Sequence, residues 1–531
     1  MTTRAQATGT IERLDLAKMA AEEGALLLLR RARCLAQDAS LEHACAADRR
    51  AALALVEALD GLPLALDQAG AYIEETPSTF GEYLDLYQAE GKALRAARGE
   101  LAPDHASVST TFSLAFKQLS GRSQAAADMI SACACLAPNA IPEEIFTEGT
   151  AELGEAIGGA VGGPAQFAKL VREATRYSLI ERQPARRTLE IHRVVQDVLR
   201  DEMGDAAYRQ WTERVVRALN TVFPDGDVTT WGRCERLVAH AQACAAHIAG
   251  CGFLFPEAAR LLNQAGVYLR ERARYAEAGP LFQQALAIDD KALGPEHPDL
   301  ATGLNNLAAL YHAQGQYAKS EPLYQRSLAI WEKTLGPEHP NVAGSLNNLA
   351  ELYRAQGQYV KAKPLYERSL TIWEKALGPE HPDVATILNN LALLHKTQGH
   401  HTKAEPLYQR SPAIHERALG PEHPQVATSL NNLAGLYHAQ GQYAKSEPLY
   451  QRSLAIREQA LGPEHPDVAT SLNNLAGLYH AQGQYAKSEP LYQRALGIAE
   501  KALGPEHPTV ATLRKNYAAL LRAAGQPRPT R

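Results

Sequence analysis

Histidine recurs at a fixed interval in the C-terminal half of this 531-residue chain. The string L-G-P-E-H-P occurs six times, always 42 residues apart, and its histidines are His297, His339, His381, His423, His465 and His507. Imidazole nitrogens are common metal ligands, so the repetition raises the question of a metal site. Each histidine, however, stands in a separate unit without a converging partner. The pattern therefore favours a capping or connector role, and no metal ion is predicted.

Two of the seven cysteines, Cys133 and Cys135, form a C-x-C pair that could also bind a metal. No second pair stands at a zinc-like spacing, and all seven cysteines lie before residue 252. An odd number of irregularly spaced cysteines is typical of reduced thiols in the cytosol. We therefore predict buried, apolar thiols here and a cytoplasmic protein.

Composition excludes several classes of protein. Hydrophobic residues make up 45% of the chain and charged residues 21%, which is ordinary for a globular protein. The net charge is -5, with acids and bases mixed along the chain, so no nucleic-acid partner is predicted. The chain begins Met1-Thr2-Thr3-Arg4, without the apolar segment of a signal peptide. The apolar run 25–29 is far too short to cross a bilayer, so no membrane association is predicted.

The 42-residue period predicts a stacked array of helix pairs. In the unit 467–508, apolar residues recur at helical spacing on both sides of Gly483-Gln484, which breaks the helix. Pro466 suits the first position of one helix, and Gly504-Pro505 ends the other. Six such pairs and a terminal helix over 510–523 are expected to form a solenoid.

The recurring pattern N-L-A-x-L-Y…G-x-Y…A/S…Y…A/S-L-x-I resembles the tetratricopeptide repeat. The 42-residue period and the stretch P-E-H-P-D-V-A-T-x-L-N-N-L-A resemble its kinesin-light-chain type over about residues 257–524. The resemblance implies a right-handed α-solenoid whose first helices line a concave groove for an extended peptide or a partner protein. It implies neither catalysis nor a cofactor.

The resemblance also assigns to that groove the first Asn of each N-N-L-A and the residues four and seven positions later, and two of these columns are polar. The first column is the first Asn of each N-N-L-A: Asn305, Asn347, Asn389, Asn431 and Asn473. The second column lies seven residues later: His312, Arg354, Lys396, His438 and His480. The amides suit the backbone of an extended peptide, and the basic column favours acidic groups in the ligand. The asparagines could instead be a packing signature that touches no ligand, and the second Asn is expected to tie helix to helix.

Pro412 replaces the leucine that other units carry at the same position. A proline inside a helix removes a hydrogen bond and clashes with the preceding turn, at a cost of about 3 kcal/mol or more. We therefore expect a kinked or shortened second helix in that unit.

In the N-terminal half, Gly61-Leu62-Pro63-Leu64-Ala65 resembles the G-L-P-L-A motif of NB-ARC ATPases, the switch module of STAND-type signalling proteins. Thr2-Thr3-Arg4 resembles the T-T-R that ends a core strand in that family. The resemblance implies a residual nucleotide site, with Pro63 near the adenine and Arg4 near the terminal phosphate.

A strand-like segment, Leu189-Glu190-Ile191, precedes His192 and resembles the winged-helix subdomain that follows the NB-ARC core. His192 falls where the M-H-D histidine contacts the ADP phosphate in relatives. Arg193 stands in place of the aspartate, so His192 could equally only end a strand and cap a helix. The predicted domains are an NB-ARC-like helical subdomain (1–100), a winged-helix-like domain (101–204), a helical linker (205–256), the repeats (257–524) and a disordered tail (525–531).

The chain contains no G-x-x-x-x-G-K-[ST] loop to cradle phosphates, and the glycine-rich run 158–163 lacks the lysine and is predicted to be a linker. The predicted fold class is mainly all-α. The predicted function is non-catalytic protein or peptide binding in a STAND-type system, with self-association as a further mode. The alternative is the C-terminal part of an NB-ARC switch that binds ADP or ATP, completed by a P-loop upstream of Met1 or in a separate chain.

Overall fold

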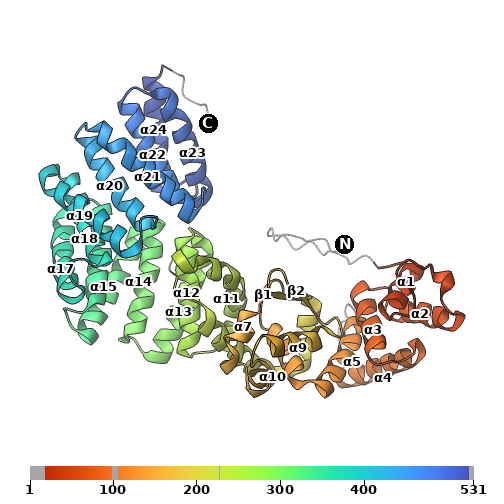
Figure 1. Ribbon diagram of the computed structural model, residues 1–531. Helices are drawn as coiled ribbons and strands as arrows, with labels where there is room; N and C mark the ends of the chain where they lie inside the picture. The colour runs from red at the N-terminus through yellow and green to blue at the C-terminus, as the bar shows by residue number, and fades with distance from the viewer. Residues whose placement is uncertain (1–17, 99–105, 227, 526–531) are drawn as a thin grey trace. The chain divides into compact units, whose positions relative to one another are not determined.

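The computed structural model describes residues 18–98, 106–226 and 228–525 (Figure 1). The chain forms two compact units, one of residues 1–222 with 235–252 and one of residues 223–234 with 253–531. Helices supply nearly all regular structure in the described ranges, so the prediction of a mainly all-α protein is confirmed. Within these ranges, no helix combines the length and the apolar character needed to cross a membrane.

The first unit packs helices around one small sheet. Its elements, in chain order, are α1 (Ala21–Arg31), η1 (Leu41–His43), α2 (Ala46–Ala58), α3 (Pro63–Glu75), α4 (Phe80–Arg98), α5 (Ala106–Arg122), α6 (Gln124–Cys133), β1 (Ile141–Pro142), α7 (Glu144–Thr147), η3 (Thr150–Glu152), α8 (Glu155–Ala160), α9 (Pro164–Thr175), β2 (Ile180–Gln183), β3 (Thr188–Ile191) and α10 (Arg193–Val222). The short helix η4 (Val228–Thr230) belongs to the second unit, and α11 (Trp231–Cys251) has residues in both units. The strands are antiparallel in the order β1-β3-β2, with Ile180 opposite Ile191. Helix α10 leaves helical geometry at Gly204, where φ is 65° and ψ is 165°.

The G-L-P-L-A segment begins helix α3. Gly61 has φ +64°, a conformation that L side chains rarely adopt, and its carbonyl oxygen accepts a hydrogen bond from the Met19 N–H at 2.8 Å. Pro63 is the first residue of α3, where its missing N–H leaves no helical hydrogen bond unmade. Ala65 and Leu66 then bury their side chains completely. The motif thus fixes a helix start and one face of the core of this unit.

The two cysteines of the C-x-C pair lie in the core of the first unit. Both are fully buried, and Cys135 Sγ lies 3.6 Å from Thr212 Oγ1. Burial raises the pKa of the Cys133 thiol and raises the pKa of Cys135 to about 11. Both groups therefore remain neutral thiols, and the prediction of buried, apolar cysteines is confirmed.

Six helix hairpins and one final helix form the array. The helices are α12 (Pro256–Glu271), α13 (Tyr275–Leu293), α14 (Pro298–Ala313), α15 (Tyr317–Leu335), α16 (Pro340–Ala355), α17 (Tyr359–Leu377), α18 (Pro382–Thr397), α19 (His401–Leu419), α20 (Pro424–Ala439), α21 (Tyr443–Leu461), α22 (Pro466–Ala481), α23 (Tyr485–Leu503) and α24 (Pro508–Ala523). First helices have 16 residues and second helices 19. Three-residue turns join the two helices of a hairpin, and the L-G-P-E-H-P connectors join successive hairpins.

Four residues of the connector have structural roles that are seen in the fold. Its glycine ends a helix with φ between 84° and 90° in all six copies. Its histidine is an N-cap, and in the fifth copy the Asp467 N–H donates to His465 Nδ1 at 3.2 Å. Its second proline is the first helical residue, and in four copies its glutamate pairs with a cation of the next hairpin, as in Lys501–Glu464 at 3.0 Å. The capping role predicted for the histidine is confirmed.

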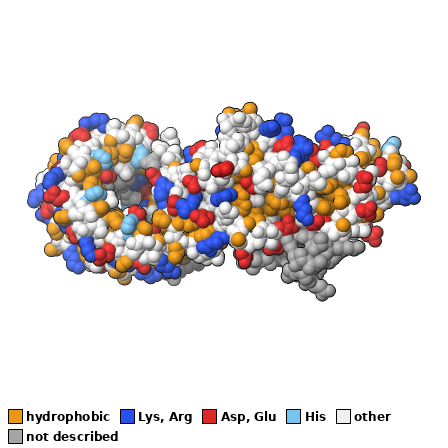
Figure 2. Space-filling model, turned by 90° about the horizontal axis from the view of Figure 1, so that it is seen from below, with side chains coloured by type: hydrophobic (Ala, Val, Ile, Leu, Met, Phe, Trp, Pro, Cys, Tyr) orange, Lys and Arg blue, Asp and Glu red, His pale blue; other side chains and the backbone are white. Residues whose placement is uncertain are grey.

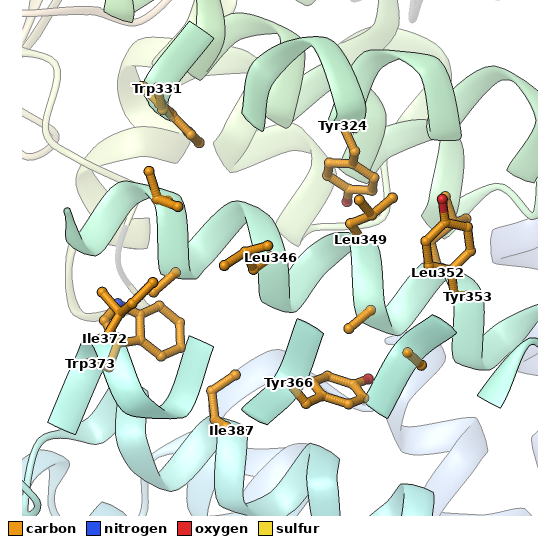
Figure 3. Close-up of a cluster of buried hydrophobic side chains, with 14 of the residues drawn as sticks. Tyr324, Trp331, Leu346, Leu349, Leu352, Tyr353, Tyr366, Ile372, Trp373 and Ile387 are labelled. Carbon is orange, nitrogen blue, oxygen red and sulfur yellow. The ribbon is translucent and has the colours of Figure 1, made fainter. Parts of the chain in front are cut away.

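The hairpins share a continuous apolar core. Trp331 of α15, Leu346 of α16 and Trp373 of α17 lie in the part of it drawn in Figure 3, each at most 7% exposed. Full burial of such a side chain contributes about 1.5–3 kcal/mol. A hairpin therefore gains much of its stability from its neighbours, which is why one alone would be marginal.

Pro412 does not shorten its helix. Helix α19 has 19 residues like the other second helices. Ser411 Oγ donates to the Ala385 carbonyl at 2.8 Å, and the equivalent Ser453 makes the same contact with Ala427 at 2.8 Å. The prediction of a shortened helix is wrong, because the proline ring is itself buried in the packed core and the neighbouring helices hold the backbone in place.

The array curls until its last two connectors touch its first two turns. His465 Nε2 donates to the Glu271 carbonyl at 2.8 Å, and His507 Nε2 donates to the Ala313 carbonyl at 2.9 Å. Arg272 Nη1 donates to the Leu461 carbonyl at 2.8 Å. We call these hydrogen bonds the closure contact. Figure 1 shows the blue C-terminal helices returning to the green first hairpins, and Figure 2 shows the curled array around a central opening.

Candidate functional site

Asparagine side chains form a ladder along the first helices of the array. The second Asn of each hairpin donates through Nδ2 to Oδ1 of the first Asn in the hairpin before it. The pairs are Asn306–Asn263 at 3.1 Å, Asn348–Asn305 at 3.1 Å, Asn390–Asn347 at 2.9 Å, Asn432–Asn389 at 3.3 Å, Asn474–Asn431 at 3.1 Å and Asn516–Asn473 at 2.9 Å. The prediction that the second Asn ties helix to helix is confirmed.

The first asparagines are partners in the same ladder, which limits what they offer a ligand. Asn347, Asn389 and Asn431 are only 4–6% exposed, whereas Asn305 and Asn473 are half-buried. One acceptor site on each amide is already occupied. The packing role that the sequence left open is therefore present, and a ligand contact by these side chains stays a prediction.

The basic column runs along the same helices, and its members influence one another. Burial lowers the pKa of His438, and the neighbouring Lys396 lowers it further. Burial also lowers the pKa of His312, with Glu351 opposing and Arg354 adding to that shift. Figure 2 shows pale-blue histidine side chains around the central opening. The column is thus a continuous strip of positive or protonatable groups.

Lys396 is a column residue whose positive charge is paired with no acidic side chain of the described chain. Its side chain is half-buried, burial lowers its pKa, and no ion pair reaches it from the described residues. It lies over Gly435 of the next hairpin, where an added Cβ would stand 2.6 Å from its Nζ and 3.2 Å from the Tyr450 hydroxyl. The absence of a side chain at Gly435 therefore leaves room for the Lys396 ammonium group beside the Tyr450 hydroxyl.

At the preceding level of the column, Arg354 is likewise a cation close to a tyrosine hydroxyl. Arg354 carries an ion pair with Glu351 at 3.8 Å, whereas its Nε is buried without a hydrogen-bond partner among the described residues. Tyr408 is 0% exposed, and its hydroxyl has no hydrogen-bond partner among the described residues. Burial raises the pKa of this hydroxyl, and the positive charge of Arg354 opposes that rise. Unused donors beside cations suit an anion, because unpaired buried polar groups are otherwise costly.

Two further basic residues continue the column beyond the five predicted ones. Arg270 lies 42 residues before His312, and Arg522 lies 42 residues after His480. Arg270 pairs with Glu271 at 2.7 Å, and Arg522 Nε donates to the Ala518 carbonyl at 3.2 Å. The fixed period would have identified both residues.

The structure gives His192 a local role. Strand β3 ends at Ile191, and the Val194 N–H donates to His192 Nδ1 at 3.2 Å as helix α10 begins. His192 therefore ends a strand and caps a helix, one of the two roles left open by the sequence. Pro63 is half-buried at the start of α3, and Arg4 lies outside the described residues. Contact of these residues with a nucleotide stays a prediction.

In the described ranges, no cluster of three or more His, Cys, Asp or Glu side chains could hold a metal ion.

Stacked helix hairpins joined by ladders define an α-solenoid, a class of repeat protein. The tetratricopeptide repeat family (TPR_12) matches residues 257–319, 299–372, 342–417, 401–459, 425–498 and 467–529. These matches cover just over half of the chain, which therefore belongs to the tetratricopeptide repeat family. A domain of unknown function (DUF7779) matches residues 115–208.

The chain is also similar to three individual proteins. A kinesin light chain with nearly identical TPR-like repeats from Podosopora anserina is 33% identical, covering 39% of this chain and 98% of its own, with a TM-score of 0.31. A nucleotide-binding leucine-rich repeat (NLR)-like protein of Hyaloscypha variabilis is 32% identical over 263 residues, 46% of this chain. A STAND protein with a tetratricopeptide repeat sensor from Pyrococcus horikoshii is 13% identical, covering 96% of this chain and 70% of its own, with a TM-score of 0.45.

This chain spans about a quarter (24%) of the length of the NLR-like relative. The prediction of tetratricopeptide repeats in the C-terminal half is confirmed by the family match, and the similarity to an NLR-like protein agrees with the NB-ARC resemblance of the N-terminal half.

Proposed function

We propose that this protein binds an extended acidic peptide, or an extended segment of a partner protein, along the basic column of its array. The observation that carries the proposal is Lys396, a half-buried cation without an ion pair in the described chain, set over Gly435. Burying an unpaired cation costs free energy, which an incoming carboxylate would recover. The protein acts in the cytoplasm within a STAND-type signalling system, as a binding component rather than as an ATPase.

The asparagine ladder and the basic column have different roles in the proposed binding. Ladder asparagines hold successive first helices in register, so the basic side chains are spaced by one hairpin each. An extended peptide presents side chains at a regular rise, so acidic residues at intervals can meet successive cations. The two central residues of the column, Arg354 and Lys396, are an arginine and a lysine, whereas the flanking column residues are histidines, so the centre of the column is the strongest anion site in this proposal.

Peptide binding is testable without knowing the natural partner. A fluorescein-labelled library of extended peptides, acidic, neutral and basic, is screened by anisotropy against the full chain. Acidic peptides should bind best, and their affinity should fall with salt. Arg354→Ala with Lys396→Ala should weaken binding at least tenfold, since a charge-assisted hydrogen bond contributes about 1.5–3 kcal/mol.

Arg452→Ala is the matched control. Arg452 pairs with Glu416 at 2.7 Å on an exposed face of the second helices, so its loss removes one positive charge but no column residue. Equal weakening in the control and in the column variant would contradict the proposal, as would a preference for basic peptides. Calorimetric titration with ATP and ADP tests the switch alternative, and micromolar nucleotide binding would favour it.

A further inference from the structure

The closure contact joins two surfaces that the array repeats along its length. One surface is a connector, whose histidine donates through Nε2. The other surface is the end of a first helix and the turn after it, where the last helical carbonyl has no partner inside its own helix. At the second closure site Pro508 packs on Gly315, where an added Cβ would lie 3.0 Å from the proline ring. The histidine hydrogen bond is common to both closure sites, and the second site adds a glycine-proline contact.

Further copies of both surfaces are present and unused. The carbonyls of Ala355, Ala439 and Ala481, each the last residue of a first helix, accept no hydrogen bond from the described chain. The glycines of the turns that follow have nothing within 4 Å of an added Cβ. We call these turns, 356–358, 440–442 and 482–484, the turn rim.

On the connectors, Nε2 of His297, His339 and His381 likewise has no partner in the described ranges, although Nδ1 of each caps its helix. We call the connectors 293–298, 335–340 and 377–382 the connector rim. Because the helices of each hairpin are antiparallel, all turns lie along one edge of the array and all connectors along the opposite edge.

Apolar exposure marks the same two rims. Val360, two residues beyond the turn 356–358, is 90% exposed, and Leu377, the first residue of a connector, is 36% exposed. Leu461 begins a connector that takes part in the closure contact, and it is only 6% exposed. Leu503, which begins the other engaged connector, is half-buried, so the exposed apolar surface of the two rims is that of Val360 and Leu377.

We propose that a second copy of this chain docks head to tail on the array, its connector rim against the turn rim of the first. The occupant is a copy of the same chain because the array already makes this contact with itself, through the same residue types. Each docked connector adds one Nε2–H to carbonyl hydrogen bond and one proline-on-glycine contact. Since the two rims are different surfaces, the interface is heterologous, and association continues beyond a dimer.

Sedimentation velocity on the full chain across a concentration series tests this inference. The connector variant is His297→Asn with His339→Asn and His381→Asn, because asparagine still caps a helix but is too short to reach across. The turn variant is Gly357→Asn with Gly441→Asn and Gly483→Asn. These glycines have φ of 72–75°, which asparagine tolerates, and the new side chain would occupy the place of the docking proline.

Wild-type chain should form species larger than a dimer as concentration rises, whereas each variant alone should associate at least tenfold more weakly. An equal mixture of the two variants should form a dimer and nothing larger, because only one intact pair of rims remains. A wild-type chain that stays monomeric, variants that associate like wild type, or a mixture without dimer would each overturn the inference. If circular dichroism shows that the turn variant is unfolded, Val360→Lys replaces it, with the same expected loss of association.

Discussion

His415 should make the middle of the array sensitive to acid, and one substitution should remove that sensitivity. It occupies the position of Trp331 and Trp373 in earlier hairpins and, at 2% exposed, is buried as they are. Its Nε2 lies 3.1 Å from the Pro382 carbonyl, and its Nδ1 lies 2.9 Å from Ser429 Oγ. Because a carbonyl oxygen can only accept, Nε2 carries the proton and the ring is satisfied in its neutral form.

Burial lowers the pKa of His415 from 6.5 to about 4, with the Pro382 carbonyl opposing and His423 adding to the shift. The unfolded chain therefore binds a proton below pH 6.5, whereas the folded chain does not until about pH 4. The contribution of His415 to the free energy of unfolding is complete above pH 6.5, and it is lost progressively as the pH falls from 6.5 to about 4. At 1.36 kcal/mol per pKa unit, the full loss is about 3 kcal/mol.

Hydrogen exchange followed by mass spectrometry reports the opening of helices α18–α20 in the intact chain. Between pH 7 and pH 4.5, after correction for intrinsic exchange rates, the free energy of opening should fall by about 2.5 kcal/mol in the wild type. In His415→Trp, which restores the residue of the earlier hairpins, this loss should disappear. His240→Gln, a change in the first unit at another buried histidine, serves as the control that leaves α18–α20 unaltered. Equal losses of protection in wild type and His415→Trp would refute the reasoning.

Three further changes test the ladders and the column. His381→Ala should cost about 1 kcal/mol in urea denaturation because it removes an N-cap acceptor, whereas His381→Asp, which keeps one, should cost almost nothing. Asn432→Leu should cost about 1–3 kcal/mol in thermal unfolding, since it leaves the buried Asn389 carbonyl oxygen without its donor. Gly435→Ala should displace Lys396 and weaken acidic-peptide binding in the anisotropy assay, with little change in melting temperature. A neutral Asn432→Leu, or an unchanged affinity in Gly435→Ala, would contradict the corresponding argument.

Helix boundaries in the array follow from local backbone chemistry and could be predicted. The break expected at Gly483-Gln484 lies in the turn between α22 and α23, and Pro466 opens α22. Glycine at positive φ and proline at a first helical position are decided by neighbouring atoms only. The same rules identified the capping histidine. The repeated motif was sufficient because each of its signals acts within a few residues.

Contacts between hairpins could not be predicted in the same way. The ladder bond from Asn474 to Asn431 spans 43 residues and depends on how two helices cross, which a residue pattern does not specify. The closure contact between His507 and Ala313 spans 194 residues and depends on the curvature accumulated over several hairpins. The effect of Pro412 was misjudged for a related reason, because the helix propensity of one residue is outweighed by tertiary packing on every side.

The asparagine ladder limits which residues of the array can determine the position of a bound ligand. A side chain that recurs in every hairpin and already has an intramolecular partner cannot distinguish one ligand position from another. The residues that contact the column differ between levels: Glu351 pairs with Arg354 within the same helix, whereas Gly435 of the next hairpin lies against Lys396. Glu351 neutralises its level in part, whereas Gly435 opens its level to an incoming carboxylate. The strongest requirement for an acidic residue in the ligand should therefore fall at Lys396, with a weaker one at Arg354.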